Sequence, residues 1–434
     1  MHASVLGSGY VGATLAACLA DLGHDVTAVD IDKTVVERLN AGDPPIAEPG
    51  LDELYSKHVG DRLRATTDYD AVLDTDLTFL TVQTPAREDG SIDLSVVLAA
   101  AEQLGETLAA KDDYHLVVVK STVIPGMVEE EVVPAIEAAS GKREGEGFDV
   151  AVNPEFQSQG SAVEDFMQPD KIVLGTDGDN GPDRALARLH EVYEPLVERS
   201  GAPIVETGRR EAAMIKYANN VFLASKISLI NEIGNVCKEY DVDAYEVADA
   251  IGLDERIGAQ FLRSGAGFGG SCFEKDTKAL IAAARAADYE PELLDAVLGV
   301  NETQPRRMLE LLDDHVDVAG KRAAVLGLAF KSGTDDTRGT RAFPVIDGLL
   351  DRGAEVVAYD PVAIENTREQ YPDIEYADSA AAALDGASGA LVVTDWDEFA
   401  ALDEEFTTMA EPVVIDGRRI IEPTDDIVYE GLTW

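Results

Sequence analysis

The chain has 434 residues, 45% of them hydrophobic, which is enough for two or three domains with well-packed cores. Its 83 acidic and 35 basic residues give a net charge of -48, and this excludes nucleic acid as a partner because no region could offset phosphate repulsion. No apolar run predicts membrane insertion or a signal peptide, and three cysteines do not suggest a disulfide framework. We therefore expect a cytoplasmic protein without membrane insertion.

In the first 200 residues, short apolar runs alternate with helical patterns, which predicts a doubly wound parallel sheet. Strands are expected at 2–6, 25–30, 77–82, 116–120, 149–152 and 171–175. One long helix follows at 209–240, with further helices at 244–250, 275–287 and 292–313. Strands return at 323–328, 355–359, 390–393 and 413–415. The expected α/β architecture is two Rossmann-like lobes joined by a helical central domain, with boundaries at 1–203, 204–305 and 306–434.

The sequence GSGYVG follows the first strand and opens a helix, as in dinucleotide-binding folds. Its glycines permit a tight turn and a close approach of pyrophosphate to the helix N-terminus. The candidate cofactor-binding residues in this turn are Gly7, Gly9, Tyr10, Val11 and Gly12. Asp30 ends the second strand, and its carboxylate favours NAD over NADP, although the nearby Lys33 weakens that preference. The alternative is a tight strand–helix turn without a ligand.

Two further loops come after expected strands, at the edge where this fold gathers ligands. Thr84 lies in one loop and Thr122 in the other, within the sequence KSTVIPG. Either hydroxyl could contact ribose or nicotinamide. A proline-stabilised turn with a capping threonine explains the same spacing equally well.

The long helix carries Lys216 and Asn220 four residues apart, so both side chains project from one face. An ammonium and an amide placed together suit a developing alkoxide or oxyanion. For a single such pair, a solvated lysine and an ordinary helical asparagine are the simpler interpretation.

Cys272 favours the catalytic interpretation of Lys216 and Asn220. It follows a loop with glycines at 265, 267, 269 and 270 and precedes a helix expected near Glu274. A thiol beside a helix N-terminus is a candidate nucleophile, whereas Cys18 and Cys237 fit small buried hydrophobes. Asp276 could orient water or cap the helix. Glu155 follows a strand, where it could act as a general base. His and Cys residues lack metal-ligand spacing, so no metal is expected.

These motifs together resemble the nucleotide-sugar 6-dehydrogenase family over nearly the whole chain. The matching segments, in family order, are GSGYVG, VDID, KST, NPEF, KYANN, ERIG, GFGGSCFEKD and GLAFKSGTDDTR. The resemblance implies oxidation of a sugar C6 hydroxymethyl group to a carboxylate, with two NAD reduced per sugar. It also implies that Cys272 forms a thiohemiacetal and a thioester.

Carried over position by position, the resemblance assigns a role to each matching residue. Lys216 and Asn220 match the oxyanion-stabilising pair, and Asp276, Glu155 and Thr122 match groups that hold or activate water. The implied cofactor-binding set adds Asp30, Thr84, Thr122, Lys275 and Arg338 to the glycine turn. The implied substrate-binding set is Glu155, Phe156, Lys216, Asn220, Arg256, Phe261, Gly269, Phe330 and Lys331. Gln159 and Val35 depart from the family pattern, in which many members have a second Glu shortly after NPEF and usually a basic residue a few positions past the acid of the second strand.

The Gly-Gly-Ser-Cys form resembles the branches that act on UDP-glucose and GDP-mannose, and UDP-glucose is the expected substrate, giving UDP-glucuronate for glycan assembly. The alternatives are GDP-mannose or a UDP-N-acetylhexosamine, a two-electron hydroxyacid dehydrogenase that needs no Cys272, and a non-catalytic binding protein. In the family, an arginine matching Arg256 often reaches across a dimer interface. Apolar positions on the long helix predict a homodimer through it, namely Met214, Phe222, Ile227, Ile230 and Ile233. The acidic composition resembles that of haloarchaeal proteins from a high-salt cytoplasm.

Overall fold

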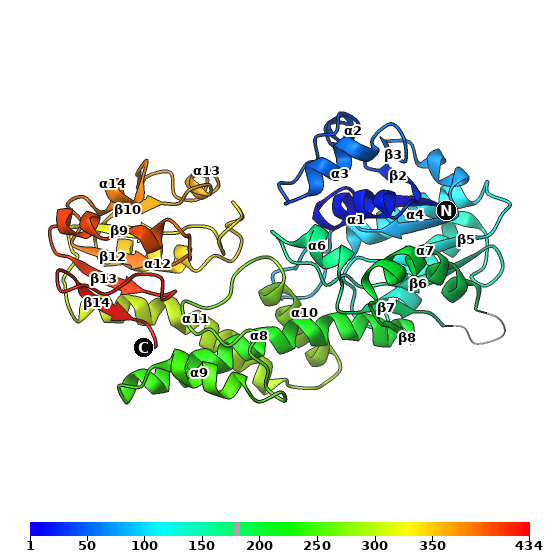
Figure 1. Cartoon of the computed structure of the whole chain (residues 1–434). Helices are drawn as coiled ribbons and strands as arrows, with labels where there is room; N and C mark the ends of the chain where they lie inside the picture. The colour runs from blue at the N-terminus through cyan, green and yellow to red at the C-terminus, as the bar shows by residue number, and fades with distance from the viewer. Residues whose placement is uncertain (178–182) are drawn as a thin grey trace. The chain divides into compact units, whose positions relative to one another are not determined.

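The computed structural model describes residues 1–177 and 183–434, which form two compact units, Met1–Ala218 and Asn219–Trp434 (Figure 1). The long helix α8 (Arg209–Glu239) begins in the first unit and ends in the second. Within the described residues, no helix is long and apolar enough to cross a membrane, and no cluster of His, Cys, Asp and Glu could hold a metal ion.

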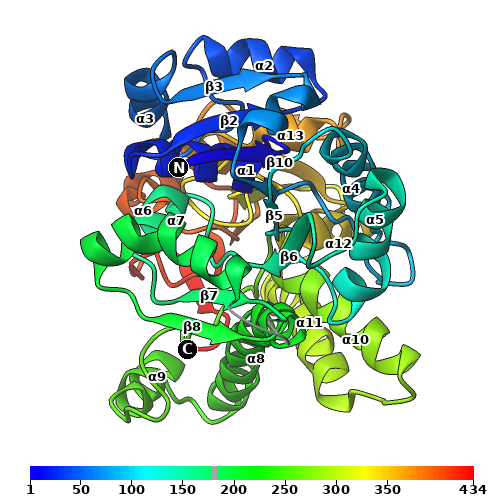
Figure 2. The same ribbon diagram turned by 90° about the vertical axis from the view of Figure 1, so that its right-hand side faces the viewer.

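The first unit contains an eight-stranded sheet in the order β3-β2-β1-β4-β5-β6-β7-β8. Its strands are β1 (His2–Leu6), β2 (Asp25–Val29), β3 (Leu63–Thr66), β4 (Leu77–Leu80), β5 (His115–Val119), β6 (Phe148–Val152), β7 (Ile172–Gly175) and β8 (Ile204–Thr207). The first six are parallel, and β7 then runs antiparallel to β6 (Figure 2). The doubly wound part of the sheet is therefore the six-stranded portion.

Helices cover this sheet because their apolar faces can be buried only against it. They are α1 (Tyr10–Asp21), α2 (Lys33–Asn40), α3 (Leu51–His58), α4 (Ser95–Leu108), α5 (Val133–Ser140), α6 (Ala162–Met167) and α7 (Arg184–Ser200). Shorter helical turns are η1 (Tyr69–Asp74) and η2 (Val128–Val132). Helix α1 is buried from Gly12 to Ala20 and lies in the core with α3 and α6.

The second unit combines helices with a six-stranded parallel sheet in the order β11-β10-β9-β12-β13-β14. Its helices are α9 (Ala244–Gly252), α10 (Phe273–Ala286), α11 (Glu292–Asp313), α12 (Ala342–Asp351), α13 (Ile364–Arg368) and α14 (Ala380–Leu384), with short turns η3 (Phe399–Ala401) and η4 (Glu404–Thr408). Its strands are β9 (Arg322–Leu326), β10 (Glu355–Tyr359), β11 (Glu375–Tyr376), β12 (Gly389–Val392), β13 (Val413–Asp416) and β14 (Val428–Gly431). Two apolar clusters pack against the two faces of this sheet.

The expected fold class is confirmed, and every expected strand and helix is present with its ends shifted by a few residues at most. The sequence did not predict β3, β8, β11 and β14. These strands pair with only one neighbour, so their side chains are exposed on more sides and their apolar pattern is weak. Helix α1 begins at Tyr10, inside the GSGYVG motif, and Gly9 is its N-cap.

Candidate active site

The β1–α1 turn has the geometry that a bound pyrophosphate requires. Gly7 has a φ of +92°, and a Cβ at Gly12 would lie 1.8 Å from the Gly7 carbonyl oxygen. A Cβ at Gly9 would meet nothing within 4 Å, so the turn is open on that side. Tyr10 and Val11 begin α1 directly after it, which exposes the helix N-terminus toward the open side. These residues fit NAD.

Asp30 follows β2 beside this turn. One of its carboxylate oxygens accepts from the Ser8 N–H at 2.6 Å and the other from the Asp32 N–H at 2.9 Å. Each oxygen keeps a second lone pair, so the half-buried carboxylate can still accept from ribose hydroxyls. Lys33 is exposed and pairs with Glu37 at 3.4 Å.

Thr84 and Thr122 follow the neighbouring strands β4 and β5. Because β4 also pairs in parallel with β1, both threonines lie at the same sheet edge as the glycine turn. Thr84 is buried and Thr122 is half-buried.

Glu155 and Lys216 form a buried ion pair in the first unit. The Lys216 Nζ donates to Glu155 Oε1 at 2.7 Å, and the two side chains are 5% and 10% exposed. Burial alone would raise the pKa of Glu155, but the Lys216 charge and hydrogen bonds from Lys216 and the Gln157 N–H hold that pKa below its ordinary value. Phe156 covers the pair, with the Lys216 Nζ 5.7 Å from its ring centre. Glu155 is thereby kept ionised beside a cation.

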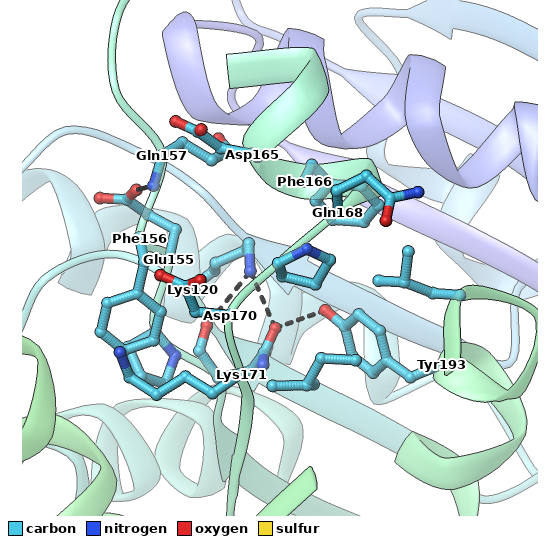
Figure 3. A pocket seen from close by; sticks show the side chains of 15 residues that line it. Lys120, Glu155, Phe156, Gln157, Asp165, Phe166, Gln168, Asp170, Lys171 and Tyr193 are labelled. Atoms are coloured by element: carbon cyan, nitrogen blue, oxygen red, sulfur yellow. Dashed lines mark hydrogen bonds between the residues drawn. The ribbon is translucent and has the colours of Figure 1, made fainter. Parts of the chain in front are cut away.

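A cavity of about 140 Å³ lies next to this pair (Figure 3). The buried side chain of Lys120 lines this cavity and donates to Asn153 Oδ1 at 2.9 Å. The Tyr193 hydroxyl donates to the same oxygen at 2.5 Å. Burial lowers the pKa of Lys120 to about 8. Lys171 places its ammonium 4.1 Å from the Phe156 ring centre. Polar groups of Lys120, Asn153, Lys171 and Tyr193 therefore line the cavity together with Glu155.

Lys120, Asn153, Lys171 and Tyr193 were not among the site residues predicted from the sequence. Lys120 carried a signal that could have found it, because a lysine directly after the apolar strand β5 must either reach solvent or find buried partners. Asn153 and Tyr193 carried none, since they meet only when β6 and α7 are packed together.

In the second unit, Asn220 and Asp276 meet in the core. Asn220 Nδ2 donates to Asp276 Oδ2 at 2.7 Å, and both side chains are buried. Lys275 donates to Asp276 Oδ1 at 2.6 Å, so each carboxylate oxygen has a partner. Cys272 is the N-cap of α10, one turn before Asp276, and is exposed. An accessible thiol therefore lies one helical turn from a buried amide–carboxylate pair.

The glycine loop before Cys272 packs against the loop that follows β9. The Gly270 N–H donates to the Arg338 carbonyl at 2.9 Å, and a Cβ at Gly269 would lie 2.6 Å from the Gly339 oxygen. A Cβ at Gly270 would lie 2.9 Å from the Phe330 ring. Only glycine allows this approach, which brings Phe330 and Arg338 to the loop that carries Cys272.

Lys331, Phe261 and Arg256 are the remaining candidates. The Lys331 Nζ lies 5.7 Å from the Phe330 ring centre. Phe261 has a φ of +63° and packs edge-on against Phe273. Arg256 is exposed and, among the described residues, all its hydrogen bonds go to Asp254. The structure therefore does not bring Arg256 to the other candidates of its unit.

A dinucleotide turn with an acidic residue after the second strand indicates a protein that binds NAD. Sequence comparison agrees, since profiles of the UDP-glucose/GDP-mannose dehydrogenase family match residues 1–197 (NAD binding domain), 210–303 (central domain) and 324–423 (UDP binding domain). The chain is 61% identical over 433 residues to UDP-glucose 6-dehydrogenase AglM of Haloferax volcanii, with 100% of each chain covered. It is 40% identical to UDP-glucose 6-dehydrogenase of Rhizobium meliloti, covering 100% of this chain and 98% of the other.

Solved structures agree with the sequence comparison. A UDP-glucose dehydrogenase from Pyrobaculum islandicum is 43% identical, with a TM-score of 0.92 over 100% of this chain and 98% of that one. A UDP-D-ManNAc dehydrogenase from Pyrococcus horikoshii is 28% identical, with a TM-score of 0.87 over 100% and 99%. The chain belongs to the UDP-glucose/GDP-mannose dehydrogenase family, its cofactor is NAD, and the resemblance stated from the motifs is confirmed.

Proposed function

We propose that this enzyme oxidises UDP-glucose at C6 to UDP-glucuronate in two successive steps, with Cys272 as the covalent nucleophile. The observation that carries the proposal is the exposed Cys272 at the start of α10, one turn before the buried Asn220–Asp276 pair. The names of the full-length relatives support UDP-glucose over other sugar nucleotides. We assign the residue ranges 1–203, 204–305 and 306–434 to NAD binding, catalysis and sugar-nucleotide binding.

NAD supplies the hydride acceptor, one molecule for each oxidation. In the first oxidation the C6 hydroxyl would release its proton to solvent and C6 would lose a hydride, and the Lys216 ammonium and Asn220 amide would stabilise the negative charge that develops on that oxygen before the aldehyde forms. The Cys272 thiolate then adds to the aldehyde carbon to form a thiohemiacetal. Loss of a second hydride and of the hydroxyl proton converts it to a thioester.

Hydrolysis of the thioester completes the reaction. Water adds to the carbonyl carbon, the C–S bond breaks, and Cys272 leaves as the thiolate with a carboxylate as product. Glu155 is ionised beside Lys216 and can accept a proton from that water. Thr122 and Asp276 help to hold the water in this proposal. Lys331, Phe330, Phe261 and Gly269 hold the sugar nucleotide, and Arg338 and Lys275 hold the cofactor.

The reaction stoichiometry tests this proposal. In molar KCl with UDP-glucose and NAD, the wild-type enzyme should form two NADH per sugar consumed, and Cys272→Ser at most one. The matched control Cys237→Ser alters a buried cysteine on α8 and should still form two. One NADH from both the wild type and Cys272→Ser would contradict the role of Cys272 and indicate a two-electron dehydrogenase. Faster turnover of GDP-mannose or of a UDP-N-acetylhexosamine would contradict the substrate.

We also propose a homodimer through α8. Phe222, Leu229 and Val236 are spaced seven residues apart on one face of the helix, and each is more than half exposed. Of the apolar positions expected from the sequence, Met214 and Phe222 are exposed, whereas Ile230 is buried and Ile227 and Ile233 pack within their own unit. Light scattering in molar salt should show a dimer that Leu229→Glu dissociates and the control Leu350→Glu on α12 does not.

The cellular setting follows from the same reaction. We propose a cytoplasmic enzyme in a high-salt cell, where the charge of -48 is screened by abundant counterions. Its product would supply uronic acid to glycan assembly. Intact uronic-acid glycans in a deletion strain would contradict this role.

A further inference from the structure

Glu48 lies in the loop before α3 and is buried, although it is a carboxylate. Its Oε1 accepts from the Ala162 N–H at 2.6 Å, and its Oε2 accepts from the Gly160 N–H at 2.9 Å. The same Oε2 accepts from the Tyr10 hydroxyl, whose oxygen also accepts from the Gly160 N–H at 3.1 Å. One carboxylate therefore joins three parts of the first unit that are distant in sequence.

Two of these parts belong to the candidate active site. Tyr10 is the first residue of α1, directly after the glycine turn that fits NAD. Gly160 ends the segment that begins at Asn153 and contains Glu155, and α6, which follows it, packs beside α1 (Figure 1). Glu48 thus links the cofactor turn to the segment that carries Glu155.

The segment between Glu155 and Ala162 also has local hydrogen bonds, among them one from the Ser161 hydroxyl to Asp165 at 3.0 Å. At one end the Gln157 N–H donates to Glu155 at 2.7 Å, and in the middle the Ser158 N–H donates to Asp165 at 2.7 Å. At the other end the Ser161 side chain does not cap α6, so the helix N-terminus depends on Glu48 for its acceptor. A substitution of Glu48 would therefore alter the conformation of residues 155–162.

We propose that Glu48 is a positioning residue that couples NAD binding to sugar-nucleotide binding. Cofactor in the glycine turn fixes Tyr10, Tyr10 and Glu48 fix Gly160 and Ala162, and residues 155–160 are then held in the conformation that the sugar contacts. This inference rests on the proposed function, because it takes residues 155–160 as part of the sugar site. It adds a role for Glu48 and for the Tyr10 hydroxyl.

Binding of UDP-glucose with and without NADH tests the coupling, because this pair cannot react. Titration calorimetry would give the ratio of the two dissociation constants, which we expect to be at least about fivefold in the wild type. In Glu48→Gln an N–H donor replaces one acceptor and faces backbone donors, so the ratio should fall to about one. Tyr10→Phe removes only the hydroxyl and should lower the ratio as well, and the double variant should lower it no further.

Glu53→Gln on the exposed side of α3 removes the same charge and should keep the wild-type ratio. If the role of Glu48 is purely structural, Glu48→Gln should raise the UDP-glucose dissociation constants with and without NADH by the same factor. Their ratio would then be unchanged, and this result would overturn the proposal. A wild-type ratio of one would overturn it too. If Glu48→Gln does not fold, Tyr10→Phe decides alone, and an unchanged ratio there contradicts the coupling. Failure of the wild type to bind UDP-glucose at all would overturn the proposed function itself.

Discussion

The two sheets share one strand order, with β3-β2-β1-β4-β5-β6 in the first unit corresponding to β11-β10-β9-β12-β13-β14 in the second. They differ directly after the first strand. Helix α1 begins at Tyr10, four residues after β1 ends, whereas α12 begins at Ala342, long after β9 ends at Leu326. Only the first sheet therefore presents a helix N-terminus beside its first strand, where a pyrophosphate binds in this fold.

The acidic residue after the second strand also differs between the two units in its capacity to bind a ligand. Asp30 accepts two backbone N–H groups and stays half-buried. Asp360, its counterpart after β10, is buried and accepts five donors, namely the N–H groups of Leu328, Ala329, Val362 and Ala363 and the indole of Trp396. Asp30 can therefore still accept hydrogen bonds from a ligand, whereas the carboxylate of Asp360 is fully used by hydrogen bonds within its own unit. Similar topology does not imply a second NAD site.

The largest expected effect is on the stability of the second unit. Asp360→Asn places an amide N–H among five donors, so we expect the free energy of unfolding to fall by about 3 kcal/mol or more. Both tryptophans, Trp396 and Trp434, lie in the second unit, so their fluorescence during denaturant unfolding in molar KCl reports on it alone. The control Asp30→Asn should leave that transition in place. An equal loss in both variants would remove the distinction between the two carboxylates.

The next effect concerns cofactor affinity. Asp30→Ala removes the ribose acceptor but only two internal hydrogen bonds, so the dissociation constant for NADH should rise by about 10- to 100-fold. UDP-glucose affinity measured without cofactor should stay unchanged. A fluorescence titration of NADH checks this, and an unchanged NADH affinity would mean that the first sheet does not use Asp30 for the cofactor.

A smaller and reciprocal effect is expected at Lys331, in the loop after β9. Lys331→Met keeps a side chain of similar length but removes the ammonium that lies 5.7 Å from the Phe330 ring centre, so UDP-glucose affinity should fall by about tenfold while NADH affinity is retained. Calorimetric titration with each ligand separately measures both. Loss of NADH affinity instead would mean that the two sheets do not divide cofactor and sugar nucleotide between them.

The smallest effect is a pH dependence at the fifth strands of the two sheets, where Lys120 follows β5 and Asp416 ends β13. Burial lowers the pKa of Lys120 to about 8, below the value of about 10.4 in the unfolded chain. Between these values the unfolded state binds more protons, so the wild type should gain stability as the pH rises from about 8 to 10. Lys120→Met should lack this gain, as judged by far-ultraviolet circular dichroism during unfolding at each pH. If the free energy of unfolding changes with pH in the same way in the wild type and Lys120→Met, the lowered pKa of Lys120 would be contradicted.

Much of the site could be predicted from local sequence. Gly7 and Gly12 signal their turn because glycine alone tolerates its backbone and its contacts, and the turn stands between a strand and a helix. Lys216 and Asn220 share a helix face by spacing alone. Cys272 stands out because the glycines before it exclude a regular element. These are short-range features, which the order of residues specifies directly.

Other features depended on the tertiary structure. The sequence shows an acid after the second strand in both halves, but only the packing around Leu328 and Trp396 makes Asp360 a structural residue. Lys216 finds Glu155, and Glu48 finds Gly160, across more than 60 residues. Local pattern determined which side chains stand at the ends of strands and helices. Long-range burial decided which of them keep a lone pair or a charge for a ligand, because each donor and acceptor is either satisfied inside the fold or left to bind.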